Sequence, residues 1–214
     1  MEFTLIDKTM CLCAKRNSGK SVLLRYLVKQ HRDDFSKIFV VCPSEEVNHF
    51  YTEFIDKRDI FPMYQEDWVL TLMKKLEGVN SKNKKEDFKR ILLILDDCCS
   101  DVDFHHSDSL KRIFTRGRHC GLALIITAQY VYQLPPVCRS NCDYMAVSQM
   151  NRQGLEILTN DFLMGNITKD EFYKMYYRCT SNYGFLLINN NSASDNDNLD
   201  EIYGVLKTPN NFIK

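Results

Sequence analysis

The chain has 214 residues, of which 44% are hydrophobic and 26% are charged, and its formal net charge is zero. This balance is typical of a globular chain with one sizeable core and excludes a disordered one. With a net charge of zero, the molecule as a whole has no positive electrostatic field that would attract nucleic acid. Any DNA contact must therefore come from local patches of basic residues or from a ring of subunits that gathers them.

Apolar runs alternate with longer amphipathic stretches, a pattern typical of an α/β fold with a mainly parallel sheet. In the first half of the chain, the predicted strands are Met10–Ala14, Lys37–Pro43 and Arg90–Asp97. The helices predicted there are Ser21–Gln30, Glu46–Asp56 and Asp67–Leu76. A polar surface connection is predicted at Ser81–Asp87.

The second half continues the alternation. The predicted strands are Leu122–Gln129, Asp143–Val147, Phe185–Asn189 and Ile202–Leu206. The predicted helices are Ser107–Arg118, Asn151–Leu158 and Lys169–Arg178. Thr168, with Glu171 three residues later, predicts a capping box at the start of the last helix. The segment Asn189–Asn198 is rich in Asn, Asp and Ser, and we expect an exposed loop.

Nine cysteines are present, and no signal peptide precedes them within Met1–Met10. The odd number predicts free thiols in a reducing compartment. Their spacing completes no zinc pattern, so we expect them to pack as small buried hydrophobic residues, with metal binding as the alternative. No apolar run reaches membrane-spanning length, and we therefore expect a soluble protein without a membrane-spanning segment.

The stretch AKRNSGKS, Ala14–Ser21, almost matches the phosphate-binding pattern G-x-x-x-x-G-K-[ST], with Ala14 in place of the first glycine. In such a loop Lys20 would reach the β- and γ-phosphates and the Ser21 hydroxyl would ligate Mg²⁺. A chance G-K-S before a helix is the alternative, and the predicted strand before it and helix after it argue against that. The predicted nucleotide-binding residues are Ala14, Lys15, Arg16, Asn17, Ser18, Gly19, Lys20, Ser21 and Val22.

Three polar residues stand at the ends of two of the predicted strands. Asp96 ends the aliphatic run ILLIL, where P-loop enzymes carry a carboxylate of the Mg²⁺ shell. Asp97 falls where additional-strand P-loop ATPases carry the group that polarises the attacking water. Gln129 ends the strand LALIITAQ, and its amide can sense the γ-phosphate and the water together. The alternative is that the two acids merely end a strand.

The ordered motifs AKRNSGKS, ILLILDD, RGRHCGLALIITAQ and LPPVCRSNCDY together resemble those of one family, the poxvirus-type DNA-packaging ATPases of nucleocytoplasmic large DNA viruses, within the FtsK–HerA superfamily. The resemblance runs from about Met10 to Asn189. It implies a P-loop NTPase three-layer sandwich with a mainly parallel central sheet of the additional-strand (RecA/FtsK–HerA-like) type. We expect one ATPase domain over residues 1–214.

The resemblance also implies an activity. It is that of a Mg²⁺-dependent ATP-hydrolysing motor, a pentameric or hexameric ring that moves double-stranded viral DNA into a preformed capsid at its portal vertex. The implied location is the virus factory in the host cell cytoplasm, with the virion as a second location. Two departures from the family pattern are Ala14 in the loop and Asp97 where the wider superfamily has glutamate.

Two further sets of basic residues remain open. A ring needs an arginine supplied to the neighbouring subunit's ATP, and the candidates are Arg116, Arg118 and Arg139. The candidates for DNA contact are Lys74, Lys75, Lys82, Lys84, Lys85, Lys89 and Arg90, for which a solvated loop is the alternative.

The alternative functions are a small-molecule kinase of the P-loop group, a HerA-like ATPase in DNA processing, and a scaffold that binds ATP without pumping. The kinase is disfavoured because such kinases usually carry an arginine-rich lid and place no Gln at this strand end.

Overall fold

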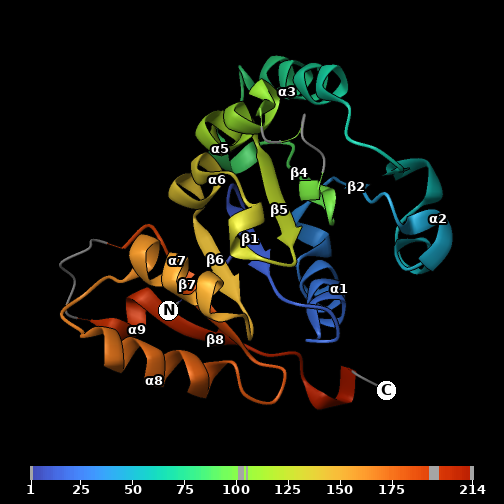
Figure 1. Cartoon of the computed structure of the whole chain (residues 1–214). Helices are drawn as coiled ribbons and strands as arrows, with labels where there is room; N and C mark the ends of the chain where they lie inside the picture. The colour runs from blue at the N-terminus through green and yellow to red at the C-terminus, as the bar shows by residue number, and fades with distance from the viewer. Residues whose placement is uncertain (1, 101–103, 105, 193–197, 213–214) are drawn as a thin grey trace. The chain divides into compact units, whose positions relative to one another are not determined.

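The computed structural model describes residues 2–100, 104, 106–192 and 198–212. They group into two compact units, drawn in Figure 1. Unit 1 comprises Met1–Phe3, Met10–Gln30 and Ala128–Lys214, and unit 2 comprises Thr4–Thr9 and His31–Thr127. The single ATPase domain over residues 1–214 stays a prediction.

Unit 2 is built on parallel strands in the order β3-β2-β4-β5. Their bounds are Ile60–Phe61 for β3, Lys37–Val41 for β2, Ile91–Leu95 for β4 and Leu122–Ala128 for β5. Most of their side chains are buried aliphatics, as expected for parallel strands covered on both faces. Helices α3 (Glu66–Asn80) and α5 (Asp108–Cys120) run beside each other in Figure 1, and the Ser107 hydroxyl caps α5 by accepting from Leu110 N.

Unit 1 has the strand order β1-β6-β7-β8, in which β1 and β6 are parallel and the last two pairs are antiparallel. The strands are β1 Thr9–Cys13, β6 Tyr144–Val147, β7 Phe185–Asn189 and β8 Tyr203–Leu206. The helices are α1 Lys20–Gln30, α6 Pro136–Asn141, α7 Arg152–Phe162, α8 Lys169–Cys179 and α9 Leu199–Ile202. The predicted capping box opens α8, because Thr168 and Glu171 exchange hydrogen bonds.

The helix predicted over Glu46–Asp56 is wrong. Helix α2 covers only Glu45–Asn48, because His49 adopts a left-handed φ of 48° that ends it. The buried Glu45 carboxylate then accepts from the backbone N–H groups of Tyr51 and Thr52, at 3.0 and 2.8 Å, and so holds the chain in a turn. A short 3₁₀-helix, Tyr51–Glu53, follows.

The other predicted elements are present, with ends that shift by a few residues. The sequence did not indicate β3, α6 or α9. Residues 193–197 of the predicted exposed loop lie outside the described residues.

All nine cysteines are buried thiols, as predicted. Burial raises the pKa of the Cys120 thiol to about 11 and that of Cys98 further still.

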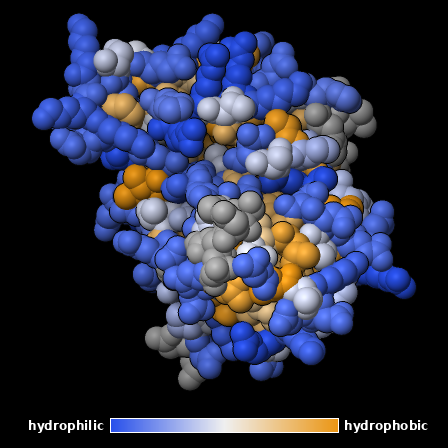
Figure 2. All heavy atoms as spheres, turned by 90° about the vertical axis from the view of Figure 1, so that its left-hand side faces the viewer, coloured by the Kyte–Doolittle hydropathy of each residue, from blue (hydrophilic) through white to orange (hydrophobic). Residues whose placement is uncertain are grey.

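Within the described part of the chain, no group of three or more His, Cys, Asp or Glu side chains is arranged to hold a metal ion. The described helices are all too short or too polar to cross a membrane. Figure 2 shows a face on which hydrophilic residues predominate and apolar residues gather in patches.

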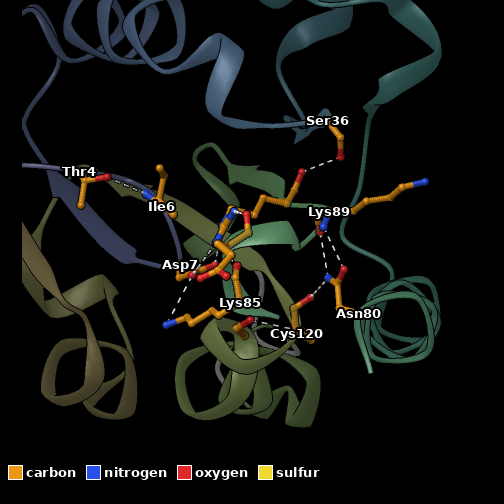
Figure 3. A network of polar contacts seen from close by, with 11 residues as sticks. Thr4, Ile6, Asp7, Ser36, Asn80, Lys85, Lys89 and Cys120 are labelled. Atoms are coloured by element: carbon orange, nitrogen blue, oxygen red, sulfur yellow. Dashed lines mark hydrogen bonds and ion pairs between the residues drawn. The ribbon is translucent and has the colours of Figure 1, made fainter. Parts of the chain in front are cut away.

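A polar network inside unit 2 uses part of the predicted DNA-contacting cluster. The Arg90 guanidinium and the Lys85 ammonium both pair with Asp7, a nearly buried carboxylate, as Figure 3 shows for Lys85. Arg90 also donates to the Lys85 carbonyl at 2.5 Å. Arg90 therefore stabilises the fold of unit 2. DNA contact stays a prediction for the lysines of this cluster, Lys85 included.

Candidate functional site

The predicted phosphate loop joins strand β1 to helix α1 within unit 1. Strand β1 is buried throughout, and Ala14 after it is 2% exposed. The Ala14 backbone N–H donates to the Ala128 carbonyl at 3.1 Å. The φ of Ala14 is outside the left-handed region. A residue with a negative φ tolerates a Cβ, so alanine can replace the glycine of the usual pattern without strain.

The turn itself has the backbone that an anion-binding loop needs. Asn17 and Gly19 both lie in the left-handed region, with φ values of 59° and 85°. The buried Ser18 hydroxyl donates to the Lys15 carbonyl at 2.5 Å and closes the turn. Helix α1 starts at Lys20, and its first N–H groups have no partner within the helix. The loop therefore presents backbone donors and a helix N-terminus together.

The two predicted acids lie after β4 in unit 2, and Thr127 at the end of β5 holds them. The Thr127 hydroxyl donates to Asp96 Oδ1 at 2.5 Å and accepts from the Asp97 backbone N–H at 3.1 Å. Asp97 has a left-handed φ of 58°, which is uncommon for a residue with a side chain. Strain of this kind gathers at functional sites. The adjacent strand thus fixes both the carboxylate of Asp96 and the backbone of Asp97.

Tyr51 adds a buried polar group beside Asp96. Its side chain is 0% exposed, and its hydroxyl makes no hydrogen bond of good geometry with any described residue. Burial, and then the negative charge of Asp96, raise the pKa of this hydroxyl well above its ordinary value. The Tyr51 hydroxyl therefore lies beside the Asp96 carboxylate, and the two oxygens together fit a polar ligand or a hydrated cation.

Gln129 and Arg139 belong to unit 1. The Gln133 side chain accepts from the backbone N–H groups of Gln129 and Tyr130, at 3.1 and 3.0 Å, and this fixes the backbone at the end of β5. Arg139 donates to Asp161 at 2.6 Å and to the Leu134 carbonyl at 2.7 Å. With only 15% of its side chain exposed, Arg139 is engaged within its own chain.

Arg116 and Arg118 lie on α5 in unit 2 and are both exposed. Between them, Gly117 is buried, and a Cβ there would come within 2.8 Å of the Leu122 carbonyl. The glycine therefore lets α5 pack closely on the start of β5, while the two arginines on either side of it reach solvent.

In unit 1, a backbone hydrogen bond joins Ala14 of the predicted loop to Ala128, the residue before Gln129. In unit 2, Thr127 joins Asp96 and Asp97. Arg139 belongs to unit 1, where it bonds Asp161, and Arg116 and Arg118 belong to unit 2. Sequence reasoning missed the part played by Thr127, although the motif TAQ contains it. It also missed Tyr51, for which no local signal exists, because its significance comes from burial beside Asp96, which follows strand β4.

Sequence comparisons relate this chain to a family of viral proteins. The model of the poxvirus A32 protein family matches residues 4–199. An uncharacterised protein of Invertebrate iridescent virus 6 is 28% identical over 202 residues, which are 94% of this chain and 77% of that protein. An uncharacterised protein of Acanthamoeba polyphaga mimivirus is also 28% identical, over 91% of this chain and 72% of that protein.

Among solved structures, the genome packaging NTPase B204 from Sulfolobus turreted icosahedral virus 2, in complex with ATP-gammaS, has a TM-score of 0.64 at 19% identity. The alignment covers 94% of this chain and 97% of that one. The likeness shows a shared fold, and the predicted α/β fold class of a P-loop NTPase is confirmed. Since a family model matches nearly the whole chain, the protein belongs to the poxvirus A32 protein family, as its ordered motifs indicated.

Proposed function

We propose that this chain is an ATP-hydrolysing motor that moves double-stranded viral DNA into a preformed capsid. The observation that carries the proposal is the phosphate loop, with left-handed Asn17 and Gly19 ahead of Lys20 at the start of α1, in a member of the poxvirus A32 family. The structural relative B204 is described as a genome packaging NTPase and was solved with ATP-gammaS. These facts support ATP as the nucleotide.

The loop would bind ATP through its backbone. The N–H groups of the turn and of the first turn of α1 hold the phosphates, and the Lys20 ammonium neutralises the β- and γ-phosphates. Gly19 needs its left-handed φ for this path, and any residue with a Cβ would be strained there. Replacing Lys20 with alanine removes a charge from the phosphate site and should abolish hydrolysis.

The oxygen donors fit Mg²⁺, because this ion prefers carboxylates and hydroxyls. The Ser21 hydroxyl and the Asp96 carboxylate would hold it, and the bound ion would offset the charge that develops on the phosphates. Thr127 orients Asp96 for this task through its hydrogen bond. Asp97 would orient and polarise the attacking water, and Gln129 would contact that water and the γ-phosphate.

The assembly that we propose is a ring of copies of this chain, five or six in number, around double-stranded DNA at the capsid portal. A ring lets an arginine of one subunit stabilise the transferring phosphoryl group in the next. The exposed Arg116 and Arg118 suit that role better than Arg139, whose side chain is held by Asp161. The proposed location is the virus factory in the cytoplasm.

The proposal is tested by ATP hydrolysis with and without linear double-stranded DNA, measured beside the mass of the protein in solution. We expect DNA to stimulate hydrolysis by an oligomeric form. We also expect Asp97→Asn to bind ATP with the affinity of the unaltered chain and to lose turnover. Normal turnover by Asp97→Asn would show that the catalytic assignment is wrong.

The same assay separates the alternatives. Transfer of phosphate to an added nucleoside or metabolite would replace the motor with a kinase. ATP binding without hydrolysis, with or without DNA, would leave a scaffold. DNA-stimulated hydrolysis that is indifferent to DNA ends and to capsid proteins would favour DNA processing over packaging.

A further inference from the structure

Tyr183 is an exposed aromatic residue that lies directly against the phosphate loop. A Cβ built on Gly19 would meet the Tyr183 side chain at 3.5 Å (Cδ1) and 3.6 Å (Cβ), which is ordinary van der Waals contact. Yet 67% of Tyr183 is exposed. One part of the side chain therefore lies over the space beside Gly19, and the rest faces solvent.

The strand order of unit 1 explains why Tyr183 reaches this position. Strands β1 and β6 are parallel, and the Ser148 N–H after β6 donates to the Cys13 carbonyl at the end of β1 at 3.0 Å. Strand β7 is antiparallel to β6, so it begins beside the end of β6. The residues before β7 therefore lie near the C-terminal ends of β1 and β6. The Ser148 hydroxyl donates to the Gly184 carbonyl at 3.2 Å and fixes the turn there.

The turn that carries Tyr183 is strained and tightly held. Asn182 and Tyr183 have φ values of 50° and 58°, and the Gly184 N–H donates to the Ser181 carbonyl at 3.0 Å, as in a type I′ turn. A bulky residue in the left-handed region is a conformational outlier. A Cβ on Gly184 would lie 2.2 Å from the Cys179 carbonyl oxygen, so only glycine fits at the position that follows Tyr183.

We propose that Tyr183 is the stacking platform for the nucleobase of the bound nucleoside triphosphate. This inference rests on the proposed function, because it takes the loop as the phosphate site. A ligand whose phosphates lie on the loop carries a planar base, and the exposed tyrosine ring beside Gly19 offers it a rigid apolar face. The turn, held by Ser148 and Gly184, keeps the ring in place before the ligand arrives.

Stacking places the base against an aromatic ring and makes no hydrogen bond to the polar groups that distinguish one base from another. The platform therefore favours a purine for its area without selecting adenine over guanine. We expect the protein to bind ATP and GTP with affinities that differ by only a few fold.

The test compares ATP with inorganic tripolyphosphate, which has the phosphates and no base. Binding of each, with Mg²⁺, is measured by calorimetry for the full chain and for Tyr183→Ala, Tyr183→Phe and Tyr177→Ala. Tyr177 is a matched control, because it is 60% exposed and lies on α8 of the same unit. We expect Tyr183→Ala to weaken ATP binding about tenfold and to leave tripolyphosphate binding unchanged. Tyr183→Phe and Tyr177→Ala should bind both ligands as the unaltered chain does.

Equal weakening of both ligands by Tyr183→Ala would show that the residue shapes the loop, and unchanged ATP binding would show that it does not touch the nucleotide. Either result overturns the platform and leaves the proposed function intact. If the unaltered chain binds neither ligand, both proposals are wrong.

A fluorescent variant gives an independent measurement. Trp68 is the chain's one tryptophan, so Tyr183→Trp in a Trp68→Phe background reports on position 183 alone. We expect ATP to quench this fluorescence and tripolyphosphate to leave it unchanged. Quenching by both ligands alike would contradict stacking.

Discussion

Thr127 holds the two acids through one hydroxyl. The hydroxyl donates to Asp96 and accepts from the backbone N–H of Asp97, whose left-handed φ makes its placement costly. Hydrogen bonds to a carboxylate that holds a metal ion fix its orientation, and losing one typically lowers metal affinity or activity by about 10- to 100-fold. Thr127 is thus a positioning residue for Asp96 and Asp97.

Thr127→Val keeps the shape of the side chain and removes the hydroxyl. Given the proposed role of Asp96 in holding Mg²⁺, we expect ATP turnover to fall about 10- to 100-fold. Thr127→Ser restores the hydroxyl and should recover most of the activity. The measurement is kcat at several Mg²⁺ concentrations. A variant with valine that turns over normally would show that Asp96 needs no partner from β5.

Among elements, α6 and α7 are joined by the ion pair of Arg139 with Asp161. The pair is short, at 2.6 Å, and largely shielded on the arginine side. Arg139 also donates to the Leu134 carbonyl before α6. Its side chain therefore fixes the Pro-Pro turn that precedes this helix.

The paired variants Arg139→Ala and Asp161→Ala test this structural role. Each should lower the free energy of unfolding by about 1 kcal/mol, because each breaks the same charged hydrogen bond. Both should keep kcat within a few fold, whereas Arg118→Ala should lower kcat and leave the melting temperature unchanged. If Arg139→Ala alone abolishes hydrolysis, Arg139 is the arginine supplied to the neighbour.

A second junction between elements is made by Asn80 at the end of α3. Its side chain accepts from Lys89 N and donates to the carbonyls of Lys89 and Cys120, all at 2.9–3.0 Å, as Figure 3 shows. Asn80 is 3% exposed, so these backbone groups have little access to water. One amide thus ties α3 to the chain before β4 and to the end of α5.

Asn80→Ala leaves those buried backbone groups without their partner. We expect the free energy of unfolding to fall by about 2 kcal/mol. In a domain of this size that change corresponds to about 4–8 °C in melting temperature. The matched control is Asn83→Ala, since Asn83 is exposed and its side chain donates to the carbonyl of Val79 one turn back. Equal melting temperatures for the two variants would contradict the role of Asn80.

Helices and strands could be predicted from the sequence where a strong signal lies within the element itself. Five consecutive aliphatics before Asp96 specify β4, and Thr168 with Glu171 specifies the start of α8, because each signal lies within a few residues. The two-residue strand β3 exists only through its pairing with β2. The hydrogen bond of Thr127 with Asp96 and the position of Tyr183 beside Gly19 involve residues far apart in the chain, and no local pattern encodes them.

For the whole molecule, the buried cysteines contribute to the loss of stability at alkaline pH. Burial raises the pKa of Cys120 from 9.0 to about 11, and the pKa values of Cys42, Cys98 and Cys179 are raised for the same reason. Above pH 9 the unfolded chain therefore releases protons that the folded chain keeps. The free energy of unfolding then falls as pH rises.

Urea unfolding in the presence of a reductant measures this fall. Between pH 9 and 10 we expect a loss of about 1 kcal/mol for each thiol whose pKa is raised by a unit or more. Cys120→Ala should reduce the slope over that range, and stability between pH 7 and 8 should be flat with respect to these groups. A stability that stays constant up to pH 10 would show that the thiols are accessible to water.

The proposed function of the whole molecule is movement along DNA driven by ATP, and displacement of a third strand measures it directly. A fluorescent oligonucleotide is bound as a triplex near one end of a linear duplex, and its release is followed after ATP is added. We predict release by the unaltered chain with ATP, and none by Lys20→Ala or with a non-hydrolysable ATP analogue. Hydrolysis of ATP on the same DNA without release of the third strand would contradict a translocating motor.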